Sequence, residues 1–168
     1  SGQSKRLEAI RIKLTGEMAK QYDIYYRVHS QEFGWLGWAK NGESAGTAGY
    51  SYRLEAIEVK LVEKGGKAPG STQDAYRQRY VSYQTHVQDI GWQGIKYDGE
   101  EAGTSGQSKR LEAINISLSN PLYSGSIEYQ THVQDIGWQG WKANGQMAGT
   151  SGQSKRLEAI RIKLTGEM

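Results

Sequence analysis

Apolar and polar side chains alternate along residues 127–134, and this pattern predicts a strand with one buried face and one wet face. The apolar positions are Ile127, Tyr129, Thr131 and Val133, and the polar positions are Glu128, Gln130, His132 and Gln134. We expect the polar row to face solvent, where it can bind a ligand.

Residues 158–164 predict a second strand, because the aliphatic side chains of Ile160, Ile162 and Leu164 share one parity. Parity also places Glu158 on that apolar face, where an unpaired carboxylate would cost about 3–5 kcal/mol. We therefore expect an ion pair with Arg156 at the start of the strand, either structural or as part of a ligand site. The same pairs are expected for Arg53 with Glu55 and for Arg110 with Glu112.

Turn signals separate these strands. Asn41-Gly42, Asp98-Gly99 and Asn144-Gly145 favour tight hairpin turns. Residues 63–80 combine Gly, Pro and polar side chains and predict a loop, in which 73–79 could form a helical turn. No segment has a sustained helical period, so the expected class is all-β.

The pattern occurs three times, at about residues 24–62, 81–118 and 127–164. In each copy an Ala-Gly-Thr segment begins 16 residues after a His, and an Arg-Leu-Glu-Ala-Ile segment begins 24 residues after it. Such short units bury their apolar faces against one another. We expect three pseudo-symmetric repeats in a β-prism, with a β-trefoil and an open β-array as alternatives.

Residues 1–18 are identical to residues 151–168, so the chain holds four Arg-Leu-Glu-Ala-Ile segments for three repeats. Recent duplication, engineering or a longer array with the same period would each produce this identity. We expect residues 1–23 to be an extra closing strand with a linker, and residues 24–168 to form the three-repeat domain.

Composition narrows the function. The 168 residues carry a net charge of +3 with interspersed signs, and this argues against a nucleic-acid partner. The absence of cysteine excludes disulfides and thiol chemistry. No apolar run predicts membrane insertion and no signal-peptide pattern is present. The 11 Tyr and 5 Trp suit half-exposed binding surfaces.

A Gly-Trp follows each polar row, and a Trp beside amide and imidazole groups suits a sugar ring. The expected ligand-binding residues are His29, Gln31, Trp35, His86, Gln88, Trp92, His132, Gln134 and Trp138. A structural role for one Trp in each repeat, and for the His, is the alternative. Trp38 and Trp141 correspond to Ile95 in repeat two, so we expect them to pack in a core or a subunit contact.

Catalysis is not expected, because every candidate group recurs three times whereas a catalytic constellation is single and asymmetric. The His residues lack metal-ligand spacing, and the Ala-Gly-Thr segment lacks the Lys of a phosphate-binding loop. The sequence predicts no catalytic residues, no metal and no cofactor.

The combined motif His-x-Gln-x-x-Gly-Trp, Ala-Gly-Thr and Arg-Leu-Glu-Ala-Ile-x-Ile-x-Leu resembles the ChW repeat, the clostridial hydrophobic repeat with a shared Trp. The resemblance covers nearly the whole chain. Repeat one departs at Phe33 and at Tyr50-Ser-Tyr52, and repeat two departs at Ile95. The resemblance implies a secreted or surface-attached bacterial protein that binds polysaccharide, cell wall or a host surface.

Two hypotheses follow. The first is a non-catalytic extracellular, lectin-like adhesion module that binds a carbohydrate, such as a cell-surface polysaccharide, through three repeats. The second is a structural protein that assembles head to tail as a homo-oligomer, by exchange of the duplicated terminal strand.

Overall fold

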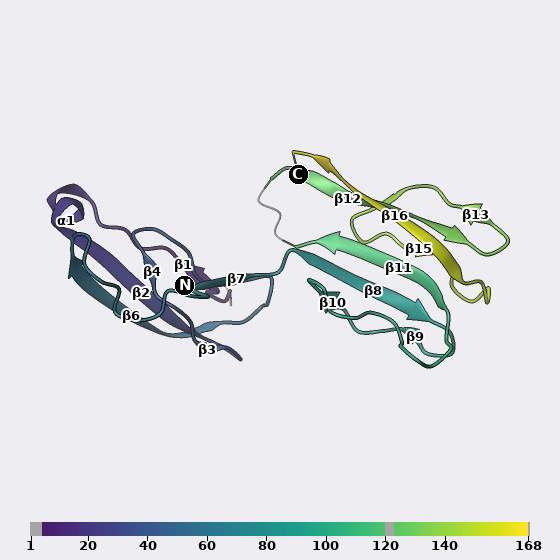
Figure 1. The fold of residues 1–168 in the computed structure, drawn as a ribbon, viewed down its shortest axis with the longest axis horizontal. Helices are drawn as coiled ribbons and strands as arrows, with labels where there is room; N and C mark the ends of the chain where they lie inside the picture. Colours follow the sequence, from purple (N-terminus) through teal and green to yellow (C-terminus); the bar gives the residue numbers. More distant parts are fainter. Residues whose placement is uncertain (1–4, 120–122, 168) are drawn as a thin grey trace. The chain divides into compact units, whose positions relative to one another are not determined.

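The computed structural model describes residues 5–119 and 123–167, and their regular secondary structure is almost entirely β-strand (Figure 1). The chain divides into two units, Ser1–Gln78 and Arg79–Met168. The first unit contains repeat one, and the second contains repeats two and three. No helix in the described part of the chain has the length and apolar character that a membrane crossing requires.

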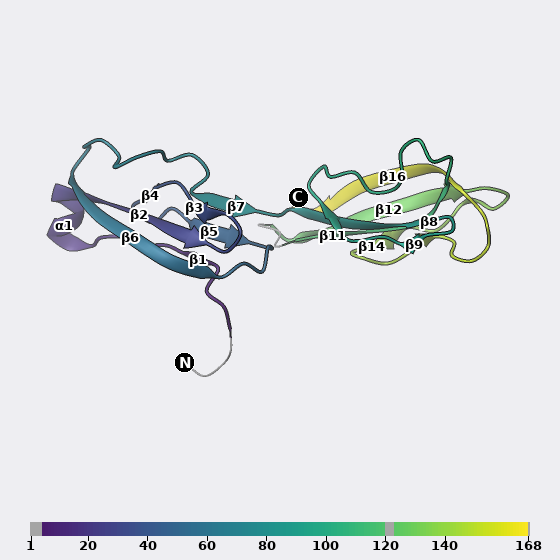
Figure 2. The same ribbon diagram turned by 90° about the horizontal axis from the view of Figure 1, so that it is seen from below.

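A long antiparallel ribbon forms the body of each repeat, and it joins a first strand to a closing strand (Figure 2). The alternating rows of the sequence supply its two faces. The ribbons are β2 (Tyr22–Ser30) with β6 (Leu54–Glu63), β8 (Val81–Val87) with β11 (Leu111–Leu118), and β12 (Gly125–Val133) with β16 (Leu157–Gly166).

Between the two long strands the chain folds back along the free edge of the first strand as two short strands. These are β3 (Gly34–Trp35) and β4 (Ala39–Lys40), β9 (Gly91–Trp92) and β10 (Lys96–Tyr97), and β13 (Gly137–Trp138) and β14 (Lys142–Ala143). The predicted turns follow, and both residues of each have positive φ, for example 46° at Asn41 and 95° at Gly42. Positive φ at both central residues is the conformation that Asn-Gly and Asp-Gly favour, so this prediction is confirmed.

The Ala-Gly-Thr segment of one repeat pairs with the closing strand of the preceding repeat. In repeat three, β15 (Ala148–Gly149) lies antiparallel to β11. In repeat one, β5 (Ala45–Ala48) pairs in the same register with β1 (Ala9–Ile10), which comes from the extra closing segment. The extra closing segment therefore pairs with repeat one in the same way as the closing strand of repeat two pairs with repeat three.

Glycine is required at this contact because the strands approach so closely. A Cβ built on Gly46 would lie 2.3 Å from the carbonyl oxygen of Glu8, and one on Gly149 would lie 2.4 Å from that of Glu112. The next residue fixes the register: the Thr47 amide donates to the Glu8 carbonyl at 2.8 Å, and the Thr150 amide donates to the Glu112 carbonyl at 2.9 Å.

Each unit has an apolar core on the side of the first strand that a preceding closing segment covers. In the first unit, Ile24, Tyr26 and Val28 of β2 are buried, and Ile10, Ile12 and Leu14 pack against their cluster. In the second unit, Ile116 of β11 packs with Ile127, Tyr129 and Ala148 of repeat three. A first strand is thus buried by the closing strand that precedes it.

The all-β class with three repeats is confirmed. None of the sheets formed by residues 5–119 and 123–167 closes on itself, as the barrel of a β-trefoil requires. The β-prism and the open β-array, which differ in how the repeats are arranged around an axis, stay predictions. Residues 5–23 belong to the same unit as repeat one, and they include a short helix, α1 (Gly16–Gln21), that the sequence did not predict. In the 63–80 loop, the expected helical turn is wrong: β7 (Tyr76–Gln78) lies parallel to β5.

Candidate functional site

Each Gly-Trp lies opposite the histidine of its own first strand. The pairing registers His29 with Trp35, His86 with Trp92 and His132 with Trp138. The imidazole and indole rings meet edge to face, with centroids 5.4–5.5 Å apart in all three repeats. This arrangement is favourable for aromatic pairs, and it holds each indole in one orientation.

A glutamate of the closing strand completes this group, although parity placed it on the apolar face. A β-bulge in each ribbon shifts the register, so that Ala159 lies opposite His132 and Leu157 opposite Val133. An extra residue in one strand redirects its side chain. Glu158 therefore approaches the histidine, and the prediction of its face is wrong.

The resulting contacts recur in all three repeats. Histidine Nδ1 lies 3.2 Å from a carboxylate oxygen of Glu55, 3.1 Å from one of Glu112 and 3.1 Å from one of Glu158. The predicted arginine pairs are also present, from Arg53, Arg110 and Arg156 to the same three carboxylates at 2.8–3.0 Å. Each repeat thus has an Arg–Glu–His–Trp row at the end of its ribbon. The constant separation of 26 residues between each His and its Glu was the sequence signal for this contact.

The three Gly-Trp indoles are partly open to solvent, at 41% exposed for Trp35 and 39% for both Trp92 and Trp138. The second tryptophans differ from each other. Trp38 is buried, as expected for packing, whereas Trp141 is exposed. The sequence gave no reason to distinguish these two tryptophans. The difference arises because the 63–80 loop packs against Trp38, where Gly70 lies close to the indole ring.

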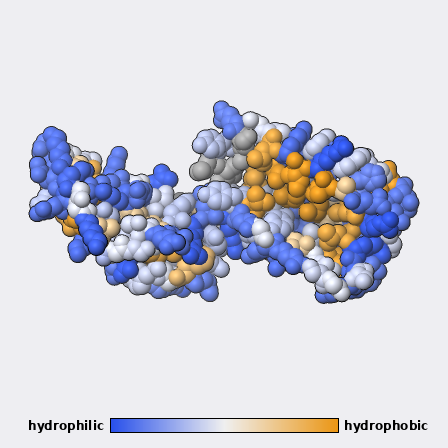
Figure 3. All heavy atoms as spheres, viewed as in Figure 1, coloured by the Kyte–Doolittle hydropathy of each residue, from blue (hydrophilic) through white to orange (hydrophobic). Residues whose placement is uncertain are grey.

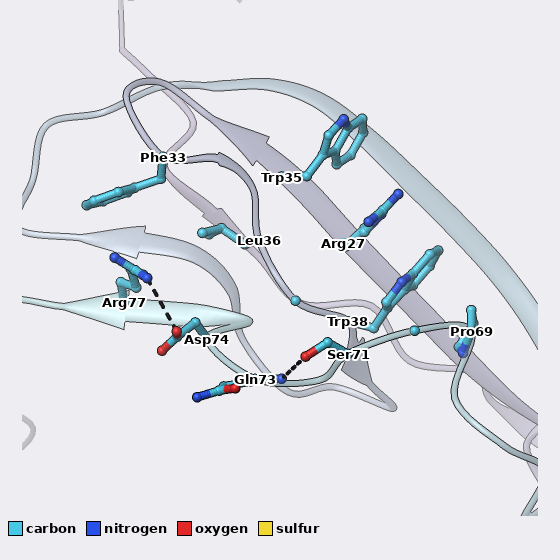
Figure 4. Close-up of a pocket in the computed structure, with 12 residues that line it drawn as sticks. Arg27, Phe33, Trp35, Leu36, Trp38, Pro69, Ser71, Gln73, Asp74 and Arg77 are labelled. Carbon is cyan, nitrogen blue, oxygen red and sulfur yellow. Dashed lines mark hydrogen bonds and ion pairs between the residues drawn. The ribbon is translucent and has the colours of Figure 1, made fainter.

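The first unit contains a cleft of about 450 Å³ beside Trp35 and Trp38 (Figure 4). Its far wall comes from the 63–80 loop, where the Ser71 carbonyl accepts a hydrogen bond from the Trp38 amide at 2.9 Å. Close packing of the loop requires Gly37, since a Cβ there would lie 2.1 Å from the Gln73 carbonyl oxygen. The polar lining includes Arg27, Ser71, Gln73, Asp74 and Arg77.

Arg27 lies between the two tryptophans on one wall of that cleft (Figure 4). Its guanidinium lies 4.8 Å from the Trp35 ring centroid and 5.0 Å from that of Trp38, so the three side chains form a row (Figure 4). Glu58 of β6 accepts a hydrogen bond from Arg27 Nε at 2.6 Å and fixes its position. The cleft thus offers aromatic surface and hydrogen-bonding groups within one wall.

The second unit has a cleft of about 410 Å³. Four of the predicted residues, His86, Gln88, Arg110 and Glu112, line it together with Ser151, Gly152 and Ser154 of repeat three. Ser151 Oγ lies 3.4 Å from His86 Nε2, so the imidazole contacts both the carboxylate and this serine. The sequence could not bring Ser151 to this site, because it belongs to another repeat.

Cations cover the indoles of repeat three. Arg161 lies over the Trp138 ring at 4.1 Å from its centroid, and Lys163 lies over Trp141 at 4.3 Å. At the place of Arg161 repeat two has the neutral Asn115 and repeat one has Glu58. In repeat one the cation over the indole is Arg27 of the first strand instead, so the three copies are not equivalent as binding surfaces.

The glutamines of the polar row have different surroundings. Gln31, Gln88 and Gln134 are half-buried, and their backbone N–H groups donate to the backbone carbonyls of Arg53, Arg110 and Arg156. Gln130, which was expected to face water, is buried and donates to the Gln139 carbonyl at 2.9 Å. The prediction of a wholly wet row is therefore wrong at Gln130.

Repeat one also contains a buried carboxylate at the opposite end of its ribbon. Asp23 accepts hydrogen bonds from Asn41 Nδ2 at 2.7 Å and from the Gly65 amide at 3.0 Å, and it lies 3.0 Å from the ammonium groups of both Lys40 and Lys64. These donors, Asn41 first, hold the pKa of Asp23 far below its ordinary value. The group ties β2 to the start of the 63–80 loop.

Within residues 5–119 and 123–167, the structure contains no cluster of three or more His, Cys, Asp or Glu side chains that could hold a metal ion. Comparison with curated proteins found no match, and comparison with solved structures found none either. The family model described as Clostridial hydrophobic W matches residues 29–63, 86–120 and 132–166, which together are more than half of the chain. Each match begins at the histidine of a first strand and includes the Gly-Trp and the closing strand, and the chain therefore belongs to the Clostridial hydrophobic W (ChW) family.

Proposed function

We propose that this chain is a non-catalytic extracellular module of the bacterial cell surface that binds polysaccharide, with its main site in the cleft of repeat one. The observation that carries the proposal is the half-exposed indole of Trp35 beside Trp38 and Arg27 in that cleft. A flat indole covers the C–H face of a sugar ring, while the surrounding polar groups bond its hydroxyls.

The polar lining supports the same ligand class. Arg27 and Arg77 donate hydrogen bonds, and Asp74, Gln73 and Ser71 carry acceptors, so both roles of a hydroxyl find partners. The wall is formed by two segments, β3–β4 and the 63–80 loop, and an open cleft of this kind can take the middle of a long chain. We therefore expect polysaccharide to bind better than a monosaccharide.

A single site of this size is weak. Covering a third of an indole buries enough apolar surface for roughly 1–2 kcal/mol. The polar cleft around His86 and Gln88 is the second expected subsite, and Trp138 with His132 and Gln134 is the third. Several weak sites on one chain raise the apparent affinity for a repeating ligand by avidity.

Titration with soluble cell-wall and capsular polysaccharides, followed by tryptophan fluorescence and calorimetry, tests the proposal. Trp35→Ala should lower the affinity roughly 5- to 30-fold, which corresponds to about 1–2 kcal/mol. Trp141→Ala is the matched control: Trp141 is 43% exposed, close to the 41% of Trp35, but does not line the cleft.

The carbohydrate proposal fails if the unmodified chain binds no polysaccharide in a broad array. It also fails at this cleft if Trp35→Ala and Trp141→Ala bind alike. Loss of binding in Trp92→Ala alone would move the main site to repeat two.

A further inference from the structure

The cation that lies over the Gly-Trp indole comes from opposite strands in repeats one and three. In repeat one it is Arg27 of β2, which pairs across the ribbon with Glu58 of β6. In repeat three it is Arg161 of β16, which pairs across the ribbon with Gln130 of β12. Two different residue pairs thus place a guanidinium over the equivalent half-exposed ring, at 4.8 Å and 4.1 Å from the ring centroid.

Repeat two has no charge at these ribbon positions. It pairs Gln84 of β8 with the neutral Asn115 of β11. Its Trp92 is nevertheless exposed to the same extent as Trp138, at 39%. The chain therefore presents similar indoles with and without a guanidinium from the ribbon, and repeat two is an internal control for the effect of the charge.

The Arg27 guanidinium has donors left for a ligand. Among the described residues its one hydrogen bond runs from Nε to Glu58 at 2.6 Å, so the N–H groups of Nη1 and Nη2 stay available. Figure 4 shows this guanidinium between the Trp35 and Trp38 rings. Its planar fork of N–H groups matches the two oxygens of a carboxylate, and such charge-assisted bonds are both strong and geometrically specific.

The charge of the cleft wall favours the same kind of ligand. The charged side chains that line the cleft are Arg27, Arg77 and Asp74, so cations outnumber carboxylates there. Asp74 lies 3.3 Å from Arg77 Nη2, and Glu58 does not line the cleft. A negatively charged group that enters the cleft therefore meets a wall of net positive charge.

The guanidinium of repeat three is separate from the aliphatic side of the same strand. Successive side chains of a strand point to opposite faces, so Arg161 points away from the exposed Ile160 and Ile162. Figure 3 shows an apolar area where β16 lies in Figure 1. A ligand held by Arg161 and Trp138 therefore binds the other face of the ribbon and leaves this apolar area untouched.

We propose that the polysaccharide bound by this chain is acidic, and that the carboxylate of a uronic acid binds Arg27 while its ring stacks on Trp35. This inference rests on the proposed function, because it names the ligand class of the same cleft. A uronic acid carries both groups that the pair recognises, which are a ring with a C–H face and a carboxylate on that ring. Arg161 with Trp138 is a second subsite for the same sugar, and repeat two is the weakest.

Calorimetric titration with polygalacturonate, alginate and hyaluronate, each beside its carboxyl-reduced form, tests the charge without removing the sugar ring. The unmodified chain should bind at least one acidic polymer about tenfold more tightly than its neutral form, as expected for a charge-assisted hydrogen bond. Raising the salt concentration from ~50 to ~500 mM should weaken binding of the acidic polymer and spare the neutral form, because salt screens exposed charges.

Arg27→Gln removes the charge and introduces the residue that repeats two and three have at this place. It should lower the affinity for the acidic polymer about tenfold and change the affinity for the neutral form less than about twofold. Arg6→Gln is the matched control, because Arg6 is an exposed arginine of the same unit that does not line the cleft. In the Arg27→Gln background, Asn115→Arg gives repeat two the residue pair of repeat three and should restore part of the preference. Circular dichroism confirms that each variant folds.

Equal binding of the acidic polymers and their neutral forms, still lost in Trp35→Ala, would leave the carbohydrate proposal intact and overturn this one. An equal effect of Arg27→Gln and Arg6→Gln would attribute the preference to the net charge of the chain, and this also overturns it. So does tighter binding of poly(glycerol phosphate), a charged polymer without sugar rings, than of any polyuronate. If no polysaccharide binds, the function proposed above fails together with this inference.

Discussion

Repeats two and three share most of their sequence, yet their first strands are covered to different extents. Tyr129 of repeat three is fully buried beneath β11, whereas Tyr83 at the same position in repeat two is half-buried. Their motifs match at this position, and Tyr129 is covered by a closing strand of its own unit. One ChW repeat is therefore not a complete packing unit, because its first strand needs the closing strand before it.

Repeat one shows the same dependence. It is completed by residues of the extra closing segment, and its Tyr26 is as fully buried as Tyr129. The first strands of repeats one and three are thus each covered by a closing segment of their own unit. Substitutions at equivalent positions separate the effect of covering from the effect of the motif itself.

The largest expected effect is at the glycine of the Ala-Gly-Thr segment. Gly46→Val should destabilise the first unit by about 3 kcal/mol or more, because a Cβ there collides with the Glu8 backbone and displaces β1. Hydrogen exchange at the Thr47 amide, which donates to Glu8, measures this displacement. Gly103→Val carries similar backbone strain, but within its own unit a Cβ there would meet only the Leu111 side chain, so its smaller effect is the control. Equal losses in the two variants would contradict the role of covering.

The second-largest effect is expected from acid, which should lower the stability of the first unit more than that of the second. The pKa of Asp23 is lowered by Asn41, the Gly65 amide and the two lysines, so its contribution to stability is complete above the unfolded pKa of about 4 and is lost as pH falls below it. Thermal unfolding of the first unit should therefore shift down between neutral and acid pH. In Asp23→Asn this pH-dependent part should disappear. A pH profile identical to that of the unmodified chain would show that Asp23 does not govern it.

A smaller decrease in the free energy of unfolding is expected when a buried tyrosine hydroxyl is removed. The Tyr129 hydroxyl donates to the Gln146 carbonyl and accepts from the Ile116 amide at 3.0 Å, and burial raises the pKa of this tyrosine. Tyr129→Phe leaves both groups without that partner and should cost about 1–3 kcal/mol. Tyr83→Phe removes only the bond to Glu100 in a half-buried place and should cost less. Denaturant unfolding of both variants measures the difference, and equal costs would contradict it.

Local rules predicted much of the fold. Alternation gave the long strands, and the Asn-Gly and Asp-Gly pairs gave the turns with positive φ. The pairing between repeats could not be found this way, because Ala148 and Ile114 are far apart in the chain and no periodicity links them. The β-bulge was also invisible, so parity placed Glu158 on the wrong face.

The candidate site divides in the same way. The three Gly-Trp indoles were predicted as half-exposed surfaces, and all three are exposed to a similar degree. The cleft of repeat one was not predicted, because its far wall comes from a loop whose course depends on close packing at Gly37. Arg27 was also missed as a cleft residue, although it replaces a glutamine at an otherwise repeated position.

The pairing between Ala-Gly-Thr segments and preceding closing strands determines where an expressed fragment of this protein should begin. A fragment that starts at the first residue of a repeat leaves its leading strand bare and discards the strand that protected it. A fragment for expression should begin upstream, near Leu111 when repeat three is wanted, so that it keeps β11. For such proteins the boundary drawn by sequence similarity and the boundary that yields a soluble piece are different places.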